Sequence, residues 1–538
     1  MRHFIFSKLT NLTMKSLYLF LFMLSFSILI SCEGQKEEEV IRIPPTQIDI
    51  SSNSIIPVPV SVKATNSSLA LTPRTTIYVD TTSGELFKVA EFFRSFLSDS
   101  IKVEGFTGTK TYGNIYLNLN DSISGNEAYK LDITEEFIQL KAKDTEGIFR
   151  GIQTIRQLLP VSVNDSVQHI GTGTITDSPT YGYRGAMLDV ARHFFNVDDV
   201  KTFIDWLAFY KMNTFHLHLT DDQGWRIEIK SWPNLTAHGG QTAVGGGEGG
   251  FFTQEDYKEI VHYAQQRYIT VIPEVDMPGH TNAALSSYPE LNCNGIAPKM
   301  YTKMQVGFST LCTDKEITYK FIDDVIGEIA AITPGPYFHI GGDESHATPL
   351  KDYIPFINKA QEIVHKHGKQ VIGWDEIAHA GLKENSVVQY WNESENAVRG
   401  IKQGAKIIMS PASKAYMDMK YHKDTQLGLR WAGYIEIDTA YIWNPATIEA
   451  DIKKENILGV EAPLWSETVT DINEIGYLVF PRLPGYAEIG WSRDSLRNWD
   501  EYKLRLAKHA NWFEAMDINY YKSEKVPWEI NEIDDSLK

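Results

Sequence analysis

The sequence predicts a (β/α)8 TIM barrel preceded by a smaller α+β domain, and three observations support this fold class. Short apolar strands alternate with helical stretches through eight repeats in the second part of the chain. The strands are continuous apolar runs, which is typical of parallel strands buried on both faces. Residues that can do chemistry follow the carboxyl ends of these strands, as in barrel enzymes. A doubly wound open sheet is the alternative that the same alternation allows.

The α+β domain is predicted over residues 56–177. Two amphipathic segments, 84–97 and 147–159, indicate helices. Together with the strands they favour a mixed sheet with helices on one face, which the turn-rich stretch 176–185 separates from the next domain. Alternation and β-branched content indicate strands at 75–80, 114–119, 128–133 and 137–142.

The barrel domain is predicted over residues 178–538. Its last segment, 481–538, is expected to be a helical tail that packs against the barrel. The eight barrel strands are expected at 185–192, 214–221, 270–276, 337–344, 369–376, 386–391, 405–410 and 458–465.

The first 32 residues have the pattern of a lipoprotein signal peptide. Lys15 precedes the apolar run 17–30, which falls short of the ~20 residues that span a bilayer. The small residues before Cys32 resemble a bacterial lipobox, in which Cys32 is lipidated and begins the mature chain. A plain signal peptide with an incidental cysteine is the alternative.

Residues 33–55 are polar and are predicted to be a linker. The acidic run directly after Cys32 resembles the surface-export signals of Bacteroidetes lipoproteins, although a solvated linker would also carry such charges. We therefore expect an exported protein that meets the membrane only through its lipid anchor. Its place would be the outer membrane, facing the periplasm or the cell surface.

The composition argues against nucleic acid as a partner, but it does not decide the role of the tryptophans or the pairing of the cysteines. The net charge is −18, and no Lys/Arg cluster supplies a basic face, so we expect no nucleic acid. The 12 tryptophans suit the faces of sugar rings but also ordinary cores. Export permits a disulfide between Cys293 and Cys312, and two isolated thiols are the alternative.

Several chemistries find no support in the sequence, which lacks the GxGxxG, P-loop and GxSxG motifs. A metal site has to be considered, because His216 and His218 face the same way on one strand. A metal would also need histidines at later strand ends. His280 and His339 are available, but His339 lies inside its predicted strand and not at its end, so we predict neither a metal nor another cofactor. Carboxylates and aromatic residues at strand ends instead suit cleavage of a glycosidic bond.

The adjacent acids Asp343 and Glu344 do not fit the usual glycosidase scheme. That scheme places two carboxylates about 5–10 Å apart, one as the acid and one as the nucleophile or base. Neighbouring side chains on a strand point to opposite faces, so this pair is poorly placed to face one bond. The two acids must therefore have roles other than those of the usual pair.

Seven motifs, in chain order, resemble the family 20 glycoside hydrolases, the β-N-acetylhexosaminidases. The resemblance runs across residues 56–515 and includes the segment 147–159 of the first domain. The motifs are YRGAMLDVARHFF (183–195), FHLHLTDDQGWRIEI (215–229), VIPEVDMPGHTNAAL (271–285), HIGGDE (339–344), GWDEI (373–377), YMD (416–418) and EAPLWSE (461–467).

The resemblance implies substrate-assisted catalysis, in which the 2-acetamido oxygen of the sugar attacks the anomeric carbon and forms an oxazolinium ion. Glu344 would be the general acid and then the base, and Asp343 would orient the acetamido group. Tyr416 would donate to the acetamido oxygen. Asp221 and His280 would form a relay behind Glu344.

The resemblance also implies a closed pocket for one terminal sugar. Arg184 and Glu467 would bind its 3- and 4-hydroxyls, and Asp418 its 6-hydroxyl. The expected partners are glycans with terminal β-linked GlcNAc or GalNAc, cleaved from the end with retention of configuration. The expected aromatic walls are Trp374, Trp391 and Trp465, with Trp431 on the same site or on the side of the leaving group.

Two other functions stay open from the sequence. A non-catalytic glycan-binding lipoprotein would lack the acid or the acetamido clamp, yet both are present here. A zinc-dependent deacetylase acting on the same sugars would lose its activity to chelators.

Overall fold

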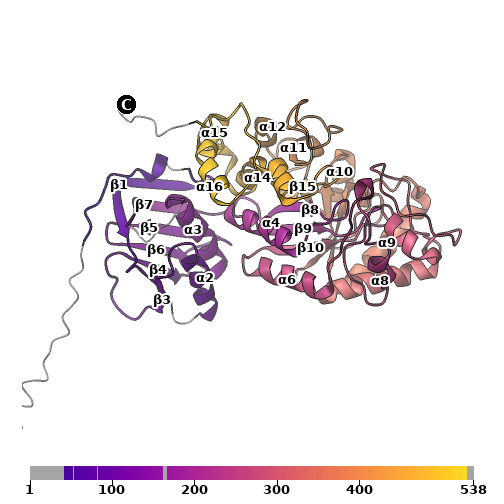
Figure 1. Ribbon diagram of the computed structural model, residues 1–538, viewed down its shortest axis with the longest axis horizontal. Coiled ribbons are helices and arrows are strands. Elements are labelled where there is room, and N and C mark those ends of the chain that lie inside the picture. The colour runs from indigo at the N-terminus through magenta and orange to yellow at the C-terminus, as the bar shows by residue number, and fades with distance from the viewer. Residues whose placement is uncertain (1–41, 53, 81–82, 162–166, 530–538) are drawn as a thin grey trace, which may run out of the picture. The chain divides into compact units, whose positions relative to one another are not determined.

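The computed structural model describes residues 42–52, 54–80, 83–161 and 167–529 (Figure 1). Cys32 and the predicted signal peptide lie outside these residues. No helix within the described ranges is both long and apolar enough to cross a membrane.

The first domain is a seven-stranded mixed sheet with the order β1-β7-β5-β6-β4-β2-β3. Pairs among β3, β2, β4 and β6 are parallel, and the pairs that involve β5 or β7 are antiparallel. Helices α2 (Gly84–Arg94) and α3 (Thr145–Leu158) pack against each other and against the sheet (Figure 1). The strands are β1 (Ser61–Leu71), β2 (Thr76–Val79), β3 (Lys102–Gly105), β4 (Asn114–Leu119), β5 (Tyr129–Ile133), β6 (Phe137–Ala142) and β7 (Gln168–Asp177).

The four predicted strands and both predicted helices of this domain are confirmed, whereas β1, β3 and β7 lie outside the prediction. β1 and β3 form the two edges of the sheet and are largely polar, so they lack clear alternation. β7 carries Gly171 and Gly173, and Gly173 has a φ of 154° at a register shift against β1. Edges and bulges weaken the periodic signal on which a strand prediction depends.

Part of the predicted linker 33–55 belongs to this domain. The Thr46 backbone N–H donates to Ser68 Oγ (2.8 Å), and both Ile50 and Ile55 are buried. The 3-10 turn η1 (Ile50–Ser52) contacts β1 and β7. Isolated apolar residues in a polar stretch give no periodicity, which is why the sequence does not reveal this contact.

All eight predicted barrel strands are present, parallel and in sequence order around a closed barrel, so the open-sheet alternative is wrong. Each predicted range runs past the carboxyl end of its strand, most of all at β11, because the chain turns into a loop at the rim. The strands are β8 (Tyr183–Asp189), β9 (Thr214–His218), β10 (Thr270–Glu274), β11 (Tyr337–His339), β12 (Gln370–Trp374), β13 (Val387–Tyr390), β14 (Lys406–Met409) and β15 (Ile457–Leu464).

Helices surround the barrel and form the predicted tail, in which α14 packs against the barrel strands β8 and β15. The helices of the barrel are α4 (Val197–Phe209), α5 (Asn234–Ala237), α6 (Gln254–Gln265), α7 (Asn282–Ser287), α8 (Glu316–Ala331), α9 (Leu350–Lys366), α10 (Ser394–Lys402), α11 (Ala412–Ala415), α12 (Ile437–Tyr441) and α13 (Ile472–Val479). Those of the tail are α14 (Arg482–Trp491), α15 (Trp499–Lys508) and α16 (Ala510–Ala515).

The barrel interior is layered because inward-facing residues recur every second position along a strand. An apolar layer comes first along the strands and includes Ile272, Ile372 and Val387. Two residues further along the same strands, at the same face, stand Glu274, Trp374 and Gln389. The layer nearest the carboxyl rim is therefore polar, and the candidate site lies directly above it.

Candidate active site

A cavity of about 330 Å³ opens at the carboxyl ends of the barrel strands. Its walls come from the segments after β8, β10, β11, β13, β14 and β15, as expected for a barrel enzyme. Its lining residues are Arg192, Met304, Val306, Asp343, Glu344, Trp391, Tyr416, Asp418, Leu429, Trp431, Trp465 and Glu467.

Two glycines turn the paired acids into this cavity. β11 ends at His339, and Gly341 and Gly342 then adopt φ values of 64° and 101°. A Cβ at Gly341 would lie 1.8 Å from Asp276 Oδ1, so glycine is required there. Glu344 itself has a φ of 44°. The expectation that Asp343 and Glu344 continue a strand is therefore wrong, and both carboxyls line one cavity.

Asp343 is buried beside a second carboxyl group. Burial raises the pKa of Asp343 well above its usual range, and the charge of Asp276 adds to this. Burial also raises the pKa of Asp276, to about 7. Asp276 Oδ1 accepts the Gly342 N–H (3.0 Å), whereas Asp343 Oδ1 has no hydrogen-bond partner among the described residues. Burial and the closeness of the two carboxyls therefore both oppose the state in which Asp276 and Asp343 are ionised together.

His280 lies behind both acids. Its Nε2 is 3.6 Å from Asp343 Oδ2 and 3.7 Å from Glu344 Oε2, and its Nδ1 is 3.3 Å from Asp221 Oδ1. Burial opposes a charge on His280, but Asp221 and Asp343 raise its pKa well above the usual range. Although burial opposes ionisation of Asp221, Arg192 and His280 lower its pKa. The predicted relay residues thus lie in contact, and they reach both acids instead of Glu344 alone.

Aromatic rings form one side of the cavity. The rings of Trp391 and Tyr416 are nearly parallel, with centroids 6.4 Å apart, and Trp431 stands edge-on to both. Trp431 is 53% exposed, which places it at the rim. The loop that carries Trp391 is held by buried Asp375, whose Oδ2 accepts its backbone N–H (3.2 Å).

Trp374 does not line the cavity, contrary to the prediction. It is fully buried in the polar layer of the barrel, where its indole N–H donates to Glu274 Oε1 (2.9 Å). Its ring centroid lies 5.7 Å from that of Trp465, which does line the cavity. Trp374 ends β12 and points inward, so it supports the cavity floor from below.

Asp418 and Glu467 present free acceptors to the cavity. Both oxygens of Asp418 and Oε2 of Glu467 are buried without a hydrogen-bond partner in the described residues. Burial raises the pKa of both carboxyls, and the charge of Glu467 adds to the effect at Asp418. Buried polar atoms without partners are costly, so this wall suits a ligand rich in hydroxyl groups.

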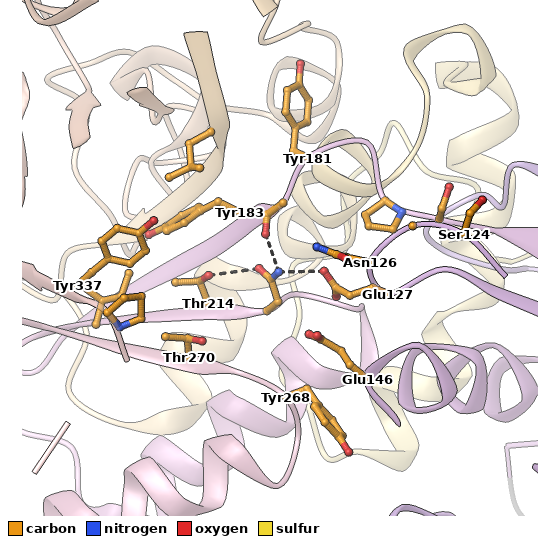
Figure 2. Close-up of a pocket in the computed structure, with 18 residues that line it drawn as sticks. Ser124, Asn126, Glu127, Glu146, Tyr181, Tyr183, Thr214, Tyr268, Thr270 and Tyr337 are labelled. Carbon is orange, nitrogen blue, oxygen red and sulfur yellow. Dashed lines mark hydrogen bonds between the residues drawn. The ribbon is translucent and has the colours of Figure 1, made fainter. Parts of the chain in front are cut away.

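Arg184 lies far from this cavity, and its prediction as a sugar-binding residue is wrong. It is the second residue of β8, at the amino end of the barrel, where its guanidinium donates to Glu127 Oε1 (3.0 Å) and the Tyr181 carbonyl (2.9 Å). Figure 2 shows Glu127 in the wall of a second cavity, of about 760 Å³. Asn213 also lines this cavity and donates through Nδ2 to Glu127 Oε1 (3.2 Å). A residue that begins a parallel strand faces the rim opposite the carboxyl ends.

Arg192, three residues after β8, is the arginine that reaches the candidate site. It pairs with Asp221 Oδ2 (2.7 Å) and Asp189 Oδ2 (3.3 Å), and its guanidinium lies 4.7 Å from the centre of the Trp465 ring. Its Nε has no hydrogen-bond partner among the described residues. The sequence signal that could have found it is its place after a strand, within the same motif as Arg184.

A disulfide joins Cys293 to Cys312, which decides the question that the sequence left open. The loop between them carries Met304 and Val306 into the cavity wall. Further contacts hold the loop, including Gln223 Nε2 to the Lys303 carbonyl (2.7 Å). These loop residues lack a sequence motif, and only the fold brings them to the site.

The clustered histidines of the polar layer do not fit a metal site. His216, Glu274 and His339 offer ligand atoms close to one another. However, His216 Nδ1 lies 2.8 Å from Glu461 and its Nε2 lies 3.0 Å from Glu274. The two carboxylates raise the pKa of His216 to about 9 against the effect of burial, so the ring holds protons where a metal would need a lone pair.

Comparison with known families matches most of the chain. Residues 181–353 and 345–494 match the family described as glycosyl hydrolase family 20, catalytic domain, and residues 52–178 match glycosyl hydrolase family 20, domain 2. A β-N-acetylhexosaminidase of Cellulomonas fimi is 39% identical over 490 residues, which is 88% of this chain and 97% of the relative. A β-hexosaminidase of Porphyromonas gingivalis is 35% identical over 92% of this chain and 67% of its own length.

Solved structures agree with these matches. The family 20 β-N-acetylhexosaminidase of Streptomyces coelicolor superimposes with a TM-score of 0.86 at 46% identity, over 90% of this chain and 100% of that chain. A mutant β-hexosaminidase of Streptomyces plicatus in complex with the product GlcNAc gives a TM-score of 0.86 at 47% identity, over 90% of this chain and 99% of that chain.

Proposed function

The chain belongs to glycosyl hydrolase family 20, and on that premise we propose that it is an exo-acting β-N-acetylhexosaminidase that works by substrate-assisted catalysis. The observation that carries the proposal is the pair Asp343 and Glu344, turned by two glycines into one aromatic-walled cavity. One carboxylate oxygen of Asp343, one of Glu344 and one ring nitrogen of His280 lie within 4.8 Å of one another. The nucleophile therefore comes from the substrate, which agrees with the known exception to the two-carboxylate scheme.

In the first step, the acetamido oxygen attacks the anomeric carbon while the bond to the leaving oxygen breaks. Glu344 gives its proton to that oxygen, and Asp343 accepts the amide N–H, whose nitrogen becomes positive. Asp343 Oδ1, which has no hydrogen-bond partner among the described residues, is the oxygen that accepts this N–H. In the second step, Glu344 takes a proton from water, the water oxygen attacks the anomeric carbon, and the oxazolinium ring opens with retained configuration.

The remaining wall residues bind one terminal sugar. Arg192 and Glu467 take the 3- and 4-hydroxyls, and Asp418 takes the 6-hydroxyl, because these groups face the cavity with unpartnered polar atoms. Tyr416 donates to the acetamido oxygen. Trp391 and Trp465 enclose the ring and the acetamido methyl, and Trp431 at the rim meets the leaving group. A cavity of about 330 Å³ suits a single terminal sugar, so cleavage is exo.

The test is hydrolysis of chromogenic β-GlcNAc and β-GalNAc glycosides by the wild type, Glu344→Gln and Asp343→Asn. We expect each substitution to lower kcat by ~10²-fold or more, in line with general-acid contributions. A thiazoline that mimics the oxazolinium ion is expected to inhibit strongly, and a chelator is expected to have no effect. Equal cleavage of plain β-glucosides would refute the assisted mechanism, because these substrates carry no acetamido group.

For location, we propose an exported lipoprotein of the Bacteroidetes type, anchored at the outer membrane through Cys32. The lipobox-like sequence before Cys32 and the acidic run after it support this proposal. The Cys293–Cys312 disulfide is consistent with an oxidising compartment. Cys32→Ser should move the protein from the membrane fraction to the soluble fraction, and protease treatment of intact cells separates surface from periplasm. An unchanged membrane fraction would exclude the anchor.

A further inference from the structure

Glu274, at the end of β10, is the centre of the polar layer below the active site. It is fully buried. Its Oε1 accepts the Trp374 indole N–H (2.9 Å) and lies 3.0 Å from His339 Nδ1. Its Oε2 is hydrogen-bonded to His218 Nδ1 and lies 3.0 Å from His216 Nε2. No step of the proposed reaction uses this carboxylate, although four groups converge on it.

His218 stands between two carboxylates. Its Nδ1 is hydrogen-bonded to Glu274 Oε2 and its Nε2 to Asp221 Oδ2 (3.0 Å). A neutral imidazole has one N–H and would set its lone pair against one of these anions. Hydrogen bonds to both anions require two N–H groups, that is, an imidazolium ring. Burial opposes this charge, but Glu274 and Asp221 raise the pKa of His218 well above its usual range.

The chain of contacts continues from His218 into the active site. Asp221 uses Oδ2 for His218 and Oδ1 for His280 Nδ1 (3.3 Å). His280 in turn reaches the carboxyls of Asp343 and Glu344. Glu274, His218, Asp221 and His280 thus form an alternating series of carboxylate and imidazole groups that ends at the reacting acids.

We propose that Glu274 is a positioning residue for the reaction: it holds His218 as a doubly donating imidazolium, which fixes Asp221 and, through it, His280 behind the paired acids. The proposal rests on the proposed function for its kinetic consequences. Its premise, that His218 carries a positive charge, can be tested without any enzymatic activity.

Other charged groups around His218 have been considered. Asp189 of β8 adds negative charge, and it shares Arg192 with Asp221. The positive neighbours are His216 on the same strand, His280 and Arg192. The Trp465 ring stands edge-on, with its centroid 4.9 Å from that of His218. Glu274 and Asp221 are the carboxylates hydrogen-bonded to the ring, so removing one leaves a single direct counter-charge.

The perturbation is Glu274→Gln, which keeps the size of the side chain and removes its charge. With one carboxylate left, buried His218 should lose its proton in the neutral range. We expect a new alkaline limb, with kcat falling by about tenfold or more between about pH 6 and pH 8 relative to the wild type. The measurement is the pH dependence of kcat and of kcat/KM from about pH 5 to pH 9.

Two matched variants separate this effect from general damage to the barrel interior. Glu461 is another buried carboxylate of the same layer, and it is hydrogen-bonded to His216, Gln389 and Tyr183 but not to His218. The variant Glu461→Gln should therefore show no new alkaline limb in kcat. In the double variant Glu274→Gln/His218→Gln, the new limb should disappear because the titrating group is gone. A Glu274→Gln profile parallel to the wild type, or an equal limb in Glu461→Gln, would overturn the proposal.

A measurement on the wild type keeps the proposal testable if Glu274→Gln fails to fold. Histidines labelled with ¹⁵N, with His218 assigned through His218→Gln, report the protonation of each ring nitrogen by NMR. We expect both nitrogens of His218 to stay protonated from about pH 6 to pH 8. A neutral His218 ring at pH 7 would refute the proposal. This readout needs no substrate, so it is independent of whether the proposed hydrolysis is correct.

Discussion

Replacing Arg184 with methionine should weaken the fold and spare the catalytic site. The guanidinium of Arg184 is fully buried and donates to Glu127, to the Tyr181 carbonyl and, through Nε, to the Lys211 carbonyl (3.0 Å). Glu127 also accepts from Arg150 Nε (2.7 Å). The substitution Arg184→Met keeps most of the side-chain volume and leaves Arg150 as the counter-charge of Glu127.

The magnitude follows from the Glu127 carboxyl. Burial opposes its ionisation, yet Arg184 and Arg150 lower its pKa from 4.5 to about 2. That difference, to which both arginines contribute, corresponds to about 3 kcal/mol of interaction with the charged form. Breaking a buried ion pair costs about 3–5 kcal/mol in other proteins, which agrees. With an unfolding entropy of about 2.1 cal/mol/K per residue, a whole-chain transition should shift by about 3 °C.

The assay combines calorimetry with hydrolysis of a chromogenic β-GlcNAc glycoside. We expect a lower melting temperature for Arg184→Met and a kcat/KM within about threefold of the wild type. Arg192→Met, the matched control, should instead lose activity by ~10²-fold or more, because Arg192 lines the cavity and pairs with Asp221 of the relay behind the reacting acids. The reasoning is refuted if Arg184→Met abolishes activity at an unchanged melting temperature, or if Arg192→Met stays active.

The same reasoning gives a pH dependence with a defined sign. The pKa of Glu127 is lower in the folded than in the unfolded protein, so its contribution is present above about pH 4.5 and is lost as the pH falls toward 2. The stability difference between the wild type and Arg184→Met should therefore narrow between about pH 4.5 and pH 2. Urea unfolding at several pH values measures it. A difference that stays constant would mean that Glu127 is not the partner that matters.

Two further predictions concern the cavity. The double substitution Cys293→Ser/Cys312→Ser opens the disulfide that closes the loop with Met304 and Val306, so it should raise KM several-fold with little change in kcat and lower the free energy of unfolding by about 3 kcal/mol. Steady-state kinetics and thermal melts measure these effects, and an unchanged KM would argue against a role of the loop in binding. Asp276→Asn removes a charge that raises the pKa of Asp343, so the acidic limb of kcat/KM should move to lower pH; a limb at the wild-type position would show that Asp276 does not act on Asp343.

The fold and most of the site can be predicted from the sequence because their signals are local. Apolar runs and helical periodicity give the eight strands of the barrel, and polar residues after those runs give the rim. Asp343, Glu344, Tyr416 and Asp418 lie in short motifs, and each lines the cavity. The edge strands β1 and β3 are not predicted from the sequence, because exposed, polar strands carry little hydrophobic periodicity.

The direction of each side chain was decided only by the tertiary structure. Arg184 and Arg192 occur in one motif, but one begins β8 and the other follows it, so they face opposite ends of the barrel. Trp374 points into the barrel, and the positive φ values at Gly341 and Gly342 turn two adjacent acids to one side. Glu274 meets His218 across neighbouring strands, and Cys293 meets Cys312 across a loop. The periodicity of a sequence specifies which face of a strand is buried. The residues that this face contacts depend on where the strand ends, on how the barrel closes and on the register between neighbouring strands, and only the tertiary structure determines these.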